Sequence, residues 1–189
     1  MIFGEHSLAC LGNGSKTQTR RIIKPQPLGT HATAIGEAKH KWAFNGITAV
    51  PQKVKSRYMV GDVLYVKEAL VEVMCPWIGH YLYPAAKDTY GLSIDATVGK
   101  VHGPMFMKER HARYHIKIVD IQAEKLHKIS KLSVVSEGYR NRKEFFEAWV
   151  EINHEINLDR WVFVYTFEDI SDRFPKPDMV IGTYEKVRP

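Results

Sequence analysis

The sequence predicts an α+β protein in which a small curled β-sheet or barrel carries flanking helices on one side. Strand-like patterns recur at residues 63–70, 113–122 and 160–167. Helical patterns occur three times, once briefly near the start and twice late in the chain. Because the strands do not alternate regularly with long helices, a doubly wound nucleotide-binding sheet is disfavoured.

The first elements are a short helix, a turn and an extended segment. Residues 5–11 can form about two helical turns, and the Gly12 to Gly14 turn ends them because Gly and Asn accept left-handed backbone. Residues 16–23 are rich in Thr and Ile and read as extended until Pro25 and Pro27. The turn therefore presents the basic residues that follow it.

Two segments in the middle of the chain show little periodicity. Residues 28–57 predict an irregular insertion or lid. A turn at 58–62 leads into the strand at 63–70, and residues 72–109 are again irregular, with a short hairpin around 80–86. We therefore expect one domain with two insertions.

The second half predicts regular elements. Residues 113–122 alternate as a strand with a buried face, and Ser130 is placed to cap a short helix that ends before Gly138. An amphipathic helix follows, a final strand covers 160–167, and residues 171–189 predict an extended tail. The apolar residues of that helix are Phe145, Trp149, Ile152 and Ile156.

Composition bounds the function classes. The chain has 189 residues, 44% of them apolar, which suits one folded domain. Cys10 and Cys75 form no C-x-x-C pair, no secretory h-region precedes them, and no apolar run of about 18 residues exists, so we expect a cytoplasmic protein without a membrane span. The net charge of +6 weakly favours polyanionic partners.

The chemistry-bearing motif is Gly14-Ser15-Lys16-Thr17-Gln18-Thr19-Arg20-Arg21. It is no phosphate-binding P-loop, because Ser15 precedes the lysine and the preceding element is a helix. The motif resembles the signature G-x-K-x-x-E-x-R of the ASCH family, whose fold is similar to PUA domains. Thr19 stands where the signature has Glu, a variant that resembles the phage and prophage branch of the family.

Further blocks carry the resemblance over about two thirds of the chain, in the family's order. They are Tyr58 to Glu68, Pro104 to Met107, Ser136 to Gly138, and the closing strand from Trp161. The chain departs at residues 108–111, where the branch has a basic-aromatic run, and at Lys67, where Arg is common. The resemblance implies a PUA-like domain over residues 1–170, with insertions at about 28–57 and 72–109.

The resemblance also implies site residues. An amidohydrolase activity in the family, which removes the acetyl group of N4-acetylcytidine, maps its catalytic residues onto Lys16, Thr19 and Glu137. In such chemistry a base activates the threonine hydroxyl, and Lys can serve if burial lowers its pKa. Because strand side chains alternate, the i, i+3 spacing of Lys16 and Thr19 implies a turn or bulge between them. The expected ligand contacts are Gly14, Thr17, Arg20, Arg21, Lys67, Glu68 and Tyr83.

Three functions stay open at this point. The chain is an RNA-binding or nucleotide-binding module, an amidohydrolase or weak ribonuclease, or a phage accessory protein that binds a host protein through its aromatic insertions. In a plainer interpretation, the basic run from Lys16 to Arg21 is a solvated edge strand, and Glu137 simply ends a helix. We expect no cofactor and no metal, because His111 and His115 lack a third ligand. The oligomeric state does not follow from the sequence.

Overall fold

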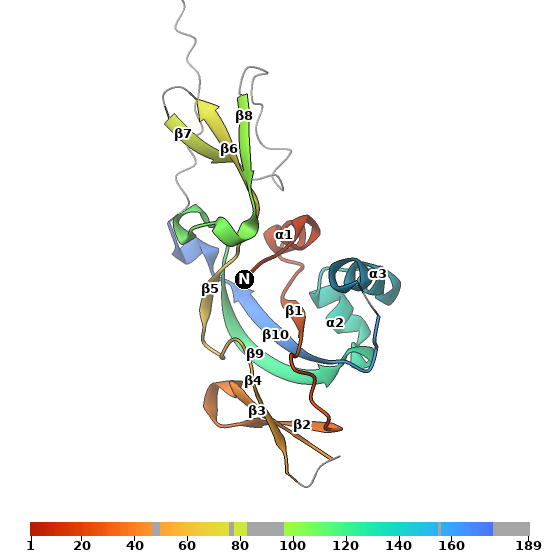
Figure 1. The fold of residues 1–189 in the computed structure, drawn as a ribbon. Coiled ribbons are helices and arrows are strands. Elements are labelled where there is room, and N and C mark those ends of the chain that lie inside the picture. The colour runs from red at the N-terminus through yellow and green to blue at the C-terminus, as the bar shows by residue number, and fades with distance from the viewer. Residues whose placement is uncertain (47–49, 76–77, 83–96, 155, 176–189) are drawn as a thin grey trace, which may run out of the picture.

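A curled antiparallel sheet of four strands forms the centre of the protein. The computed structural model describes residues 1–46, 50–75, 78–82, 97–154 and 156–175 (Figure 1), and of these 71–75, 78–82 and 97–101 as backbone only. The strand order is β1-β10-β9-β5 and every pairing is antiparallel. The strands are β1 (Gln18–Ile22), β5 (Val63–Tyr65), β9 (His115–Lys125) and β10 (Trp161–Asp169). The predicted α+β class with a curled sheet is confirmed.

The register of β1 against β10 decides which residues face the helices. Arg20 pairs with Val164, which packs in the apolar cluster under α2 and α3. Thr19 pairs with Tyr165, whose side chain belongs to the main core on the opposite face. Because side chains alternate along a strand, β1 sends Arg20 towards the helices and Thr19 and Arg21 to the other face.

The predicted strand at 63–70 is divided between two sheets. β5 covers only its beginning, and its last residue starts β6 (Leu70–Cys75) in a separate sheet. Between the two, the Lys67 N–H donates to the carbonyl of Met1 (2.6 Å) and the Lys67 carbonyl accepts from the N–H of Phe3 (3.3 Å). The prediction of extended backbone is confirmed, whereas the prediction of one continuous strand is wrong because the chain changes partner at Lys67.

The described part of residues 28–57 contains a regular sheet, so the expectation of an irregular segment is wrong. Their three strands pair in the order β2-β3-β4. Trp42, Ala43 and Phe44 are buried in succession, and Trp42 and Phe44 join the main core. Burial on both faces removes the two-residue alternation that sequence patterns rely on. The strands are β2 (His31–Ile35), β3 (Lys41–Asn45) and β4 (Gln52–Lys55).

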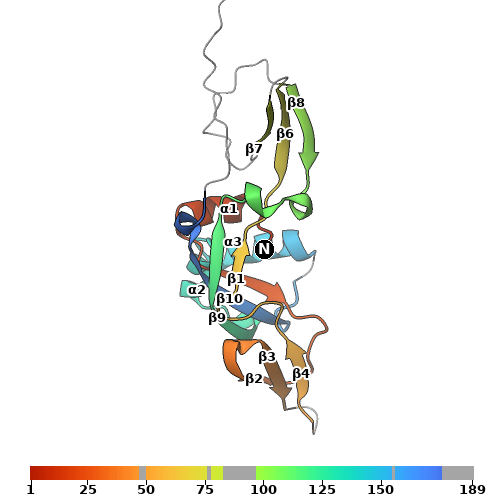
Figure 2. The ribbon, with the colours of Figure 1, turned by 90° about the vertical axis from the view of Figure 1, so that its left-hand side faces the viewer.

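A third sheet lies at the other end of the molecule from β2-β3-β4, as both views show (Figures 1 and 2). Its order is β7-β6-β8, with β7 (Ile78–Leu82) and β8 (Thr97–His102) flanking β6. The hairpin predicted around 80–86 lies only partly within the described residues. Tyr83 falls outside them, so its role as a ligand contact stays a prediction.

The helix α2 begins where the sequence places its cap, at Ser130. The helix α1 covers Glu5–Gly12 and α2 covers Lys131–Ser136, with the Ser130 hydroxyl accepting from the Ser133 N–H. The helix α3 (Arg142–Asn153) buries Phe145 and Trp149 as predicted. The expectation that Ile152 continues the buried face is wrong, because it is 65% exposed, and Ile156 lies beyond the helix and is exposed.

The remaining elements connect these parts. Short 3-10 turns are η1 (Glu37–Lys39), η3 (Pro104–Phe106), η4 (Glu109–His111), η5 (Leu126–Lys128) and η6 (Ser171–Arg173). The predicted tail therefore begins with the turn η6. Just before it, the N–H of Ile170 bonds to the carbonyl of His115 (2.8 Å). Residues 176–189 lie outside the described residues. In the described part of the chain, every helix is too short or too polar to cross a membrane.

Candidate functional site

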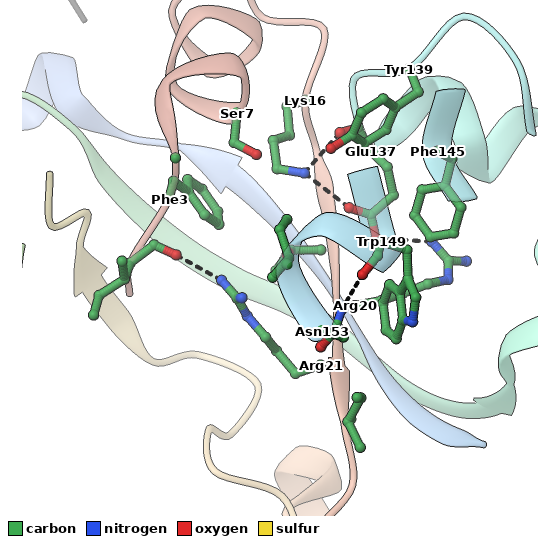
Figure 3. A pocket seen from close by; sticks show the side chains of 15 residues that line it. Phe3, Ser7, Lys16, Arg20, Arg21, Glu137, Tyr139, Phe145, Trp149 and Asn153 are labelled. Carbon is green, nitrogen blue, oxygen red and sulfur yellow. Dashed lines mark hydrogen bonds and ion pairs between the residues drawn. The ribbon is translucent and has the colours of Figure 1, made fainter. Parts of the chain in front are cut away.

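A cavity of about 240 Å³ lies beside β1, between α1 and α3 (Figure 3). β1 is an edge strand of the main sheet, so the side away from β10 is open to this cavity. Its volume is slightly below the roughly 300–1,000 Å³ of sites that enclose a drug-sized ligand, which suits one ring system. The lining includes Lys16, Thr19, Arg20 and Arg21 from the motif and Glu137 from the end of α2.

The segment after α1 brings Lys16 and Thr19 into the same cavity. Gly14 takes a positive φ of 75° and turns the chain out of the helix. The N–H of Lys16 bonds to the carbonyl of Cys10 (3.0 Å), and the N–H of Thr17 bonds to the carbonyl of Ser136 (2.8 Å). The regular pairing with β10 starts only at residue 18, so Lys16 lies before the strand and escapes its alternation.

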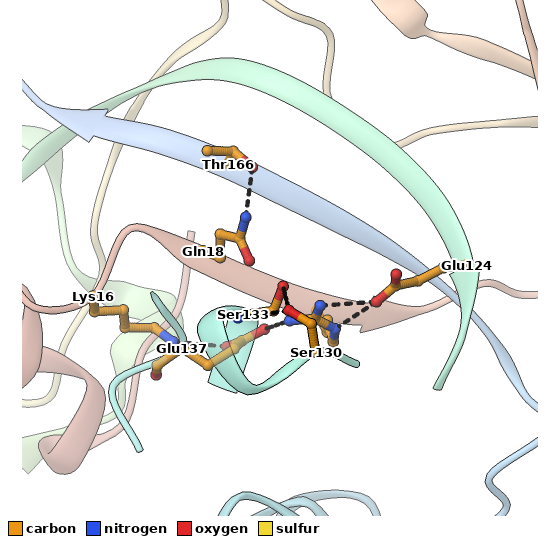
Figure 4. A network of polar contacts seen from close by, with 8 residues as sticks. Lys16, Gln18, Glu124, Ser130, Ser133, Glu137 and Thr166 are labelled. Atoms are coloured by element: carbon orange, nitrogen blue, oxygen red, sulfur yellow. Dashed lines mark hydrogen bonds and ion pairs between the residues drawn. The ribbon is translucent and has the colours of Figure 1, made fainter. Parts of the chain in front are cut away.

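A buried ionic network occupies one wall of the cavity (Figure 4). The Lys16 ammonium donates to the carbonyl oxygen of Glu137 (2.8 Å) and to its Oε2 (2.9 Å). Arg20 Nη1 donates to Glu137 Oε1 (3.1 Å), while Arg20 Nε and Nη2 donate to Glu124 Oε1 (3.0 and 2.8 Å). The side chains of Lys16, Arg20 and Glu137 are only 2%, 1% and 5% exposed.

The network is balanced in charge and fixes its members. Two cations face two carboxylates, and both oxygens of Glu137 are bonded, one to Lys16 and one to Arg20. Buried charges are tolerated only when they are paired and hydrogen-bonded. The sequence alternative in which Glu137 ends a helix also holds, because Glu137 is the C-cap residue of α2 and its carbonyl accepts from the Lys16 cation.

Gly138 holds Glu137 in this position. It takes a positive φ of 91°, and its N–H bonds to the carbonyl of Val135 (2.8 Å) as the helix closes. A Cβ added there would lie 2.8 Å from Cys10 Cβ and 2.9 Å from Cys10 Sγ. The close contact between α1 and the end of α2 therefore requires glycine next to the network.

Replacing Gly138 by alanine should lower the free energy of unfolding by about 1–3 kcal/mol, because the residue would be strained and would press on Cys10. Chemical denaturation monitored by circular dichroism measures this. Gly103→Ala is the matched control: Gly103 has a φ of −63° and no atom within 4 Å of an added Cβ. That control should shift stability by about 1 kcal/mol or less, and equal shifts in both variants would contradict the packing argument.

Thr19 lines the cavity but is not bonded to Lys16. The residue is buried, and within the described residues no hydrogen bond joins its hydroxyl to the Lys16 ammonium. A nucleophile and its base normally lie within about 2.6–3.2 Å, although apo geometry is often looser. The three predicted catalytic residues thus share one cavity, with Lys16 held by Glu137 and not by Thr19.

Arg21 reaches the opposite wall of the cavity. Its Nη2 donates to the carbonyl of Ile2 (2.7 Å), and its guanidinium lies 6.0 Å from the centre of the Phe3 ring. The Lys16 ammonium lies 5.4 Å from the same ring. Burial lowers the pKa of Arg21, and the nearby Glu137 opposes that shift. Two cations, Lys16 and Arg21, therefore lie near the Phe3 ring.

Four other predicted ligand contacts, all among the described residues, do not line the cavity. Gly14 and Thr17 are exposed in the turn before β1. Glu68 is buried in an ion pair with Arg113, and the Lys67 ammonium donates to the carbonyl of Met105 (3.2 Å). The fifth residue of this set, at position 83, lies outside the described residues. Lys67 nevertheless lies next to the cavity, because its backbone bonds to the segment that carries Ile2.

Sequence reasoning missed the aromatic and amide walls of the cavity. These are Phe3, Tyr139, Phe145, Trp149 and Asn153. The helical spacing marked Phe145 and Trp149 as core residues, and both also border the cavity. Asn153 directly follows Ile152 on α3 and its Nδ2 donates to the carbonyl of Trp149 (2.9 Å). No local pattern marks Phe3, which reaches the site only because the N-terminal segment lies against β5 and β1.

The described residues offer no metal site, and the comparisons with known proteins offer no match for this chain. Among the described residues, no group of three or more His, Cys, Asp or Glu side chains is placed to hold a metal ion. Comparisons with family models, with curated proteins and with solved structures found no match to this chain.

Proposed function

We propose that this chain binds one base of an RNA or of a modified nucleoside or nucleotide in the cavity beside β1, as an ASCH-type protein of PUA-like architecture. The observation that carries the proposal is the buried Lys16–Glu137–Arg20 network facing a cavity with aromatic walls. Fixed polar groups among aromatic surfaces are typical of sites that orient a planar polar ring.

The cavity offers both donors and acceptors to the edge of a base. The Lys16 ammonium has three N–H groups, and two of them are bonded to Glu137, which leaves one for a ligand carbonyl. The amide oxygen of Asn153 has no partner among the described residues and can accept from an exocyclic amine. The Thr19 hydroxyl can do either. Such a set recognises a ring that carries a carbonyl beside an amino or acylamino group.

The backbone of β1 adds a second row of polar groups. The bonds from Phe167 N to Thr17 O and from Ile23 N to Trp161 O put the odd-numbered residues of β1 in hydrogen-bonded positions against β10. In an antiparallel pair such positions alternate with non-bonded ones. The N–H and C=O of Arg20 therefore point to the open edge of the sheet, on which the cavity lies.

Binding of cytidine, N4-acetylcytidine and short single-stranded RNA tests the proposal by calorimetry. Phe3→Leu keeps apolar volume but removes a ring, and it should weaken binding by about 5- to 100-fold, since stacking on an aromatic residue is worth roughly 1–3 kcal/mol per base. Phe167→Leu is the matched control, because Phe167 packs against Phe3 with ring centres 5.9 Å apart but does not line the cavity. Equal affinities of the two variants would refute a base stacked on Phe3.

A second candidate function is hydrolysis of an acylated base, and one observation favours it. Lys16, Thr19 and Glu137 line the same cavity. In the buried pair, transfer of a proton from Lys16 to Glu137 across 2.9 Å would give two neutral groups, and the neutral amine could then accept the Thr19 proton. The threonine oxygen would attack the amide carbon, the C–N bond would break with the proton going to the leaving amine, and water would release acetate from the acyl-threonine.

A further inference from the structure

The ionic network at the cavity leaves no net positive charge for an anion. Lys16 and Arg20 are both matched by Glu137 and Glu124, so the motif's apparent surplus of charge is largely cancelled. A ligand phosphate therefore needs other cations. Three cations near the cavity form no salt bridge with a carboxylate among the described residues: Arg21, Arg57 and Lys67.

We propose that Arg21, Arg57 and Lys67 form a phosphate subsite at the rim of the cavity, so that its ligand is a nucleotide or a nucleic-acid strand and not a free nucleoside. The inference rests on the proposed function, and it concerns the phosphate of the ligand, for which the base pocket offers no net positive charge. Arginine and lysine are the side chains that bind phosphate, arginine through its planar fork and lysine as a point charge.

Two of these cations flank Ile2, which lines the cavity and is 43% exposed. On one side, Arg21 Nη2 donates to the Ile2 carbonyl (2.7 Å). On the other side, Lys67 forms a bridge with Ile2, with backbone bonds to the residues before and after it. Ile2 therefore lies between the Arg21 guanidinium and the backbone of Lys67.

Arg57 completes the cluster from the segment before β5. Its guanidinium lies 5.7 Å from the Tyr58 ring, and the Tyr58 and Tyr165 ring centres are 5.3 Å apart. Burial, and then the charges of Lys67, Arg21 and Arg57, lower the pKa of the Met1 amino group to about 6, which accords with three cations around the N-terminus. The N-terminus lies next to Ile2, at the rim of the cavity.

The three cations have N–H groups that are not used in the hydrogen bonds described above. Lys67 uses one of its three ammonium N–H groups, on the carbonyl of Met105. Within the described residues, the Arg21 guanidinium makes one hydrogen bond, to the Ile2 carbonyl, and the Arg57 guanidinium lies over the Tyr58 ring. A phosphate placed at Ile2 would relieve their mutual repulsion, while its base occupies the cavity.

The test compares cytidine, 3′-CMP, 5′-CMP, a cytidine trinucleotide and pyrophosphate by calorimetry at low ionic strength. We expect a phosphate on either position to raise affinity at least about tenfold over cytidine, with the gain shrinking as salt rises. A further gain for the trinucleotide identifies a strand as the source of the phosphate. The double variant Arg57→Gln, Lys67→Gln should remove this gain and leave cytidine binding unchanged.

Matched controls are available on the same protein. Lys125 also lies over an aromatic ring and donates to a backbone carbonyl, as Lys67 does, and Arg142 lies over Phe146 as Arg57 lies over Tyr58. The double variant Lys125→Gln, Arg142→Gln should keep the phosphate gain.

Two results separate failure of this inference from failure of the base pocket. The subsite is overturned, and the base pocket stands, if cytidine and its phosphates bind with equal affinity. The same follows if both double variants lose the phosphate gain equally. If no nucleoside or nucleotide binds, but pyrophosphate binds and the Arg57, Lys67 variant alone loses it, the subsite stands and the base pocket fails.

Discussion

Replacing Glu137 by alanine should lower the free energy of unfolding by about 3–5 kcal/mol, because it removes the shared partner of two buried cations. Lys16 and Arg20 would keep their charges at 2% and 1% exposure, and only Arg20 would retain a carboxylate, that of Glu124. An unpaired buried charge is costly, whereas an intact buried pair adds little net stability. Guanidinium denaturation should show a lower midpoint with an unchanged slope.

A surface carboxylate provides the comparison for this variant. Glu147 lies on α3 and forms an exposed pair with Lys143 at 3.9 Å, so Glu147→Ala should change stability by roughly 0.5 kcal/mol or less. Glu137→Gln keeps an acceptor for Lys16 and should fall between the two alanine variants. If Glu137→Ala and Glu147→Ala denature at the same midpoint, the network does not hold the fold at this point.

The regular parts of the fold were predictable because their local signals agree with their tertiary setting. The strand at β9 buries Ile116, Ile118 and Ile121 among less buried residues, and Ser130 caps α2 with its own hydroxyl. The β2-β3-β4 sheet was not predictable, since consecutive burial of Trp42, Ala43 and Phe44 looks like no strand or helix pattern. The division of residues 63–70 depends on a bridge to Ile2, which no local pattern encodes.

The candidate site was predictable in part. A motif resemblance named Lys16, Thr19 and Glu137, and the fold brings all three to one cavity. The motif could not show that Arg20 is neutralised, because its partner Glu124 lies 104 residues away on β9. Arg57 was missed for the same reason, as only folding brings its charge close to that of Arg21. Pairwise electrostatics across the sheet therefore decides which basic residues remain for a ligand.

If the cavity hydrolyses an acylated cytosine, Thr19→Ala should reduce release of acetate from N4-acetylcytidine by about 10⁴–10⁶-fold, the usual loss for a deleted nucleophile. Thr19 is buried without a hydrogen bond to Lys16, so its truncation should leave the Lys16–Glu137 pair and the fold in place. Product is followed by chromatography, and circular dichroism checks the fold. Lys16→Ala should abolish turnover as well, and Glu137→Gln should slow it by roughly 10²–10⁴-fold.

Two further variants distinguish a nucleophile from a residue that only shapes the cavity. Thr19→Ser keeps the attacking oxygen and should retain measurable turnover. If Thr19 has only a steric role, the serine and alanine variants should have similar turnover. Thr33→Ala changes an exposed threonine on β2 that does not line the cavity, and this variant should match the wild type. Wild-type protein that binds N4-acetylcytidine but never releases acetate, or a Thr19→Ala variant with full turnover, would rule out the threonine mechanism. Binding without release would leave the base-binding function as the one that fits the cavity.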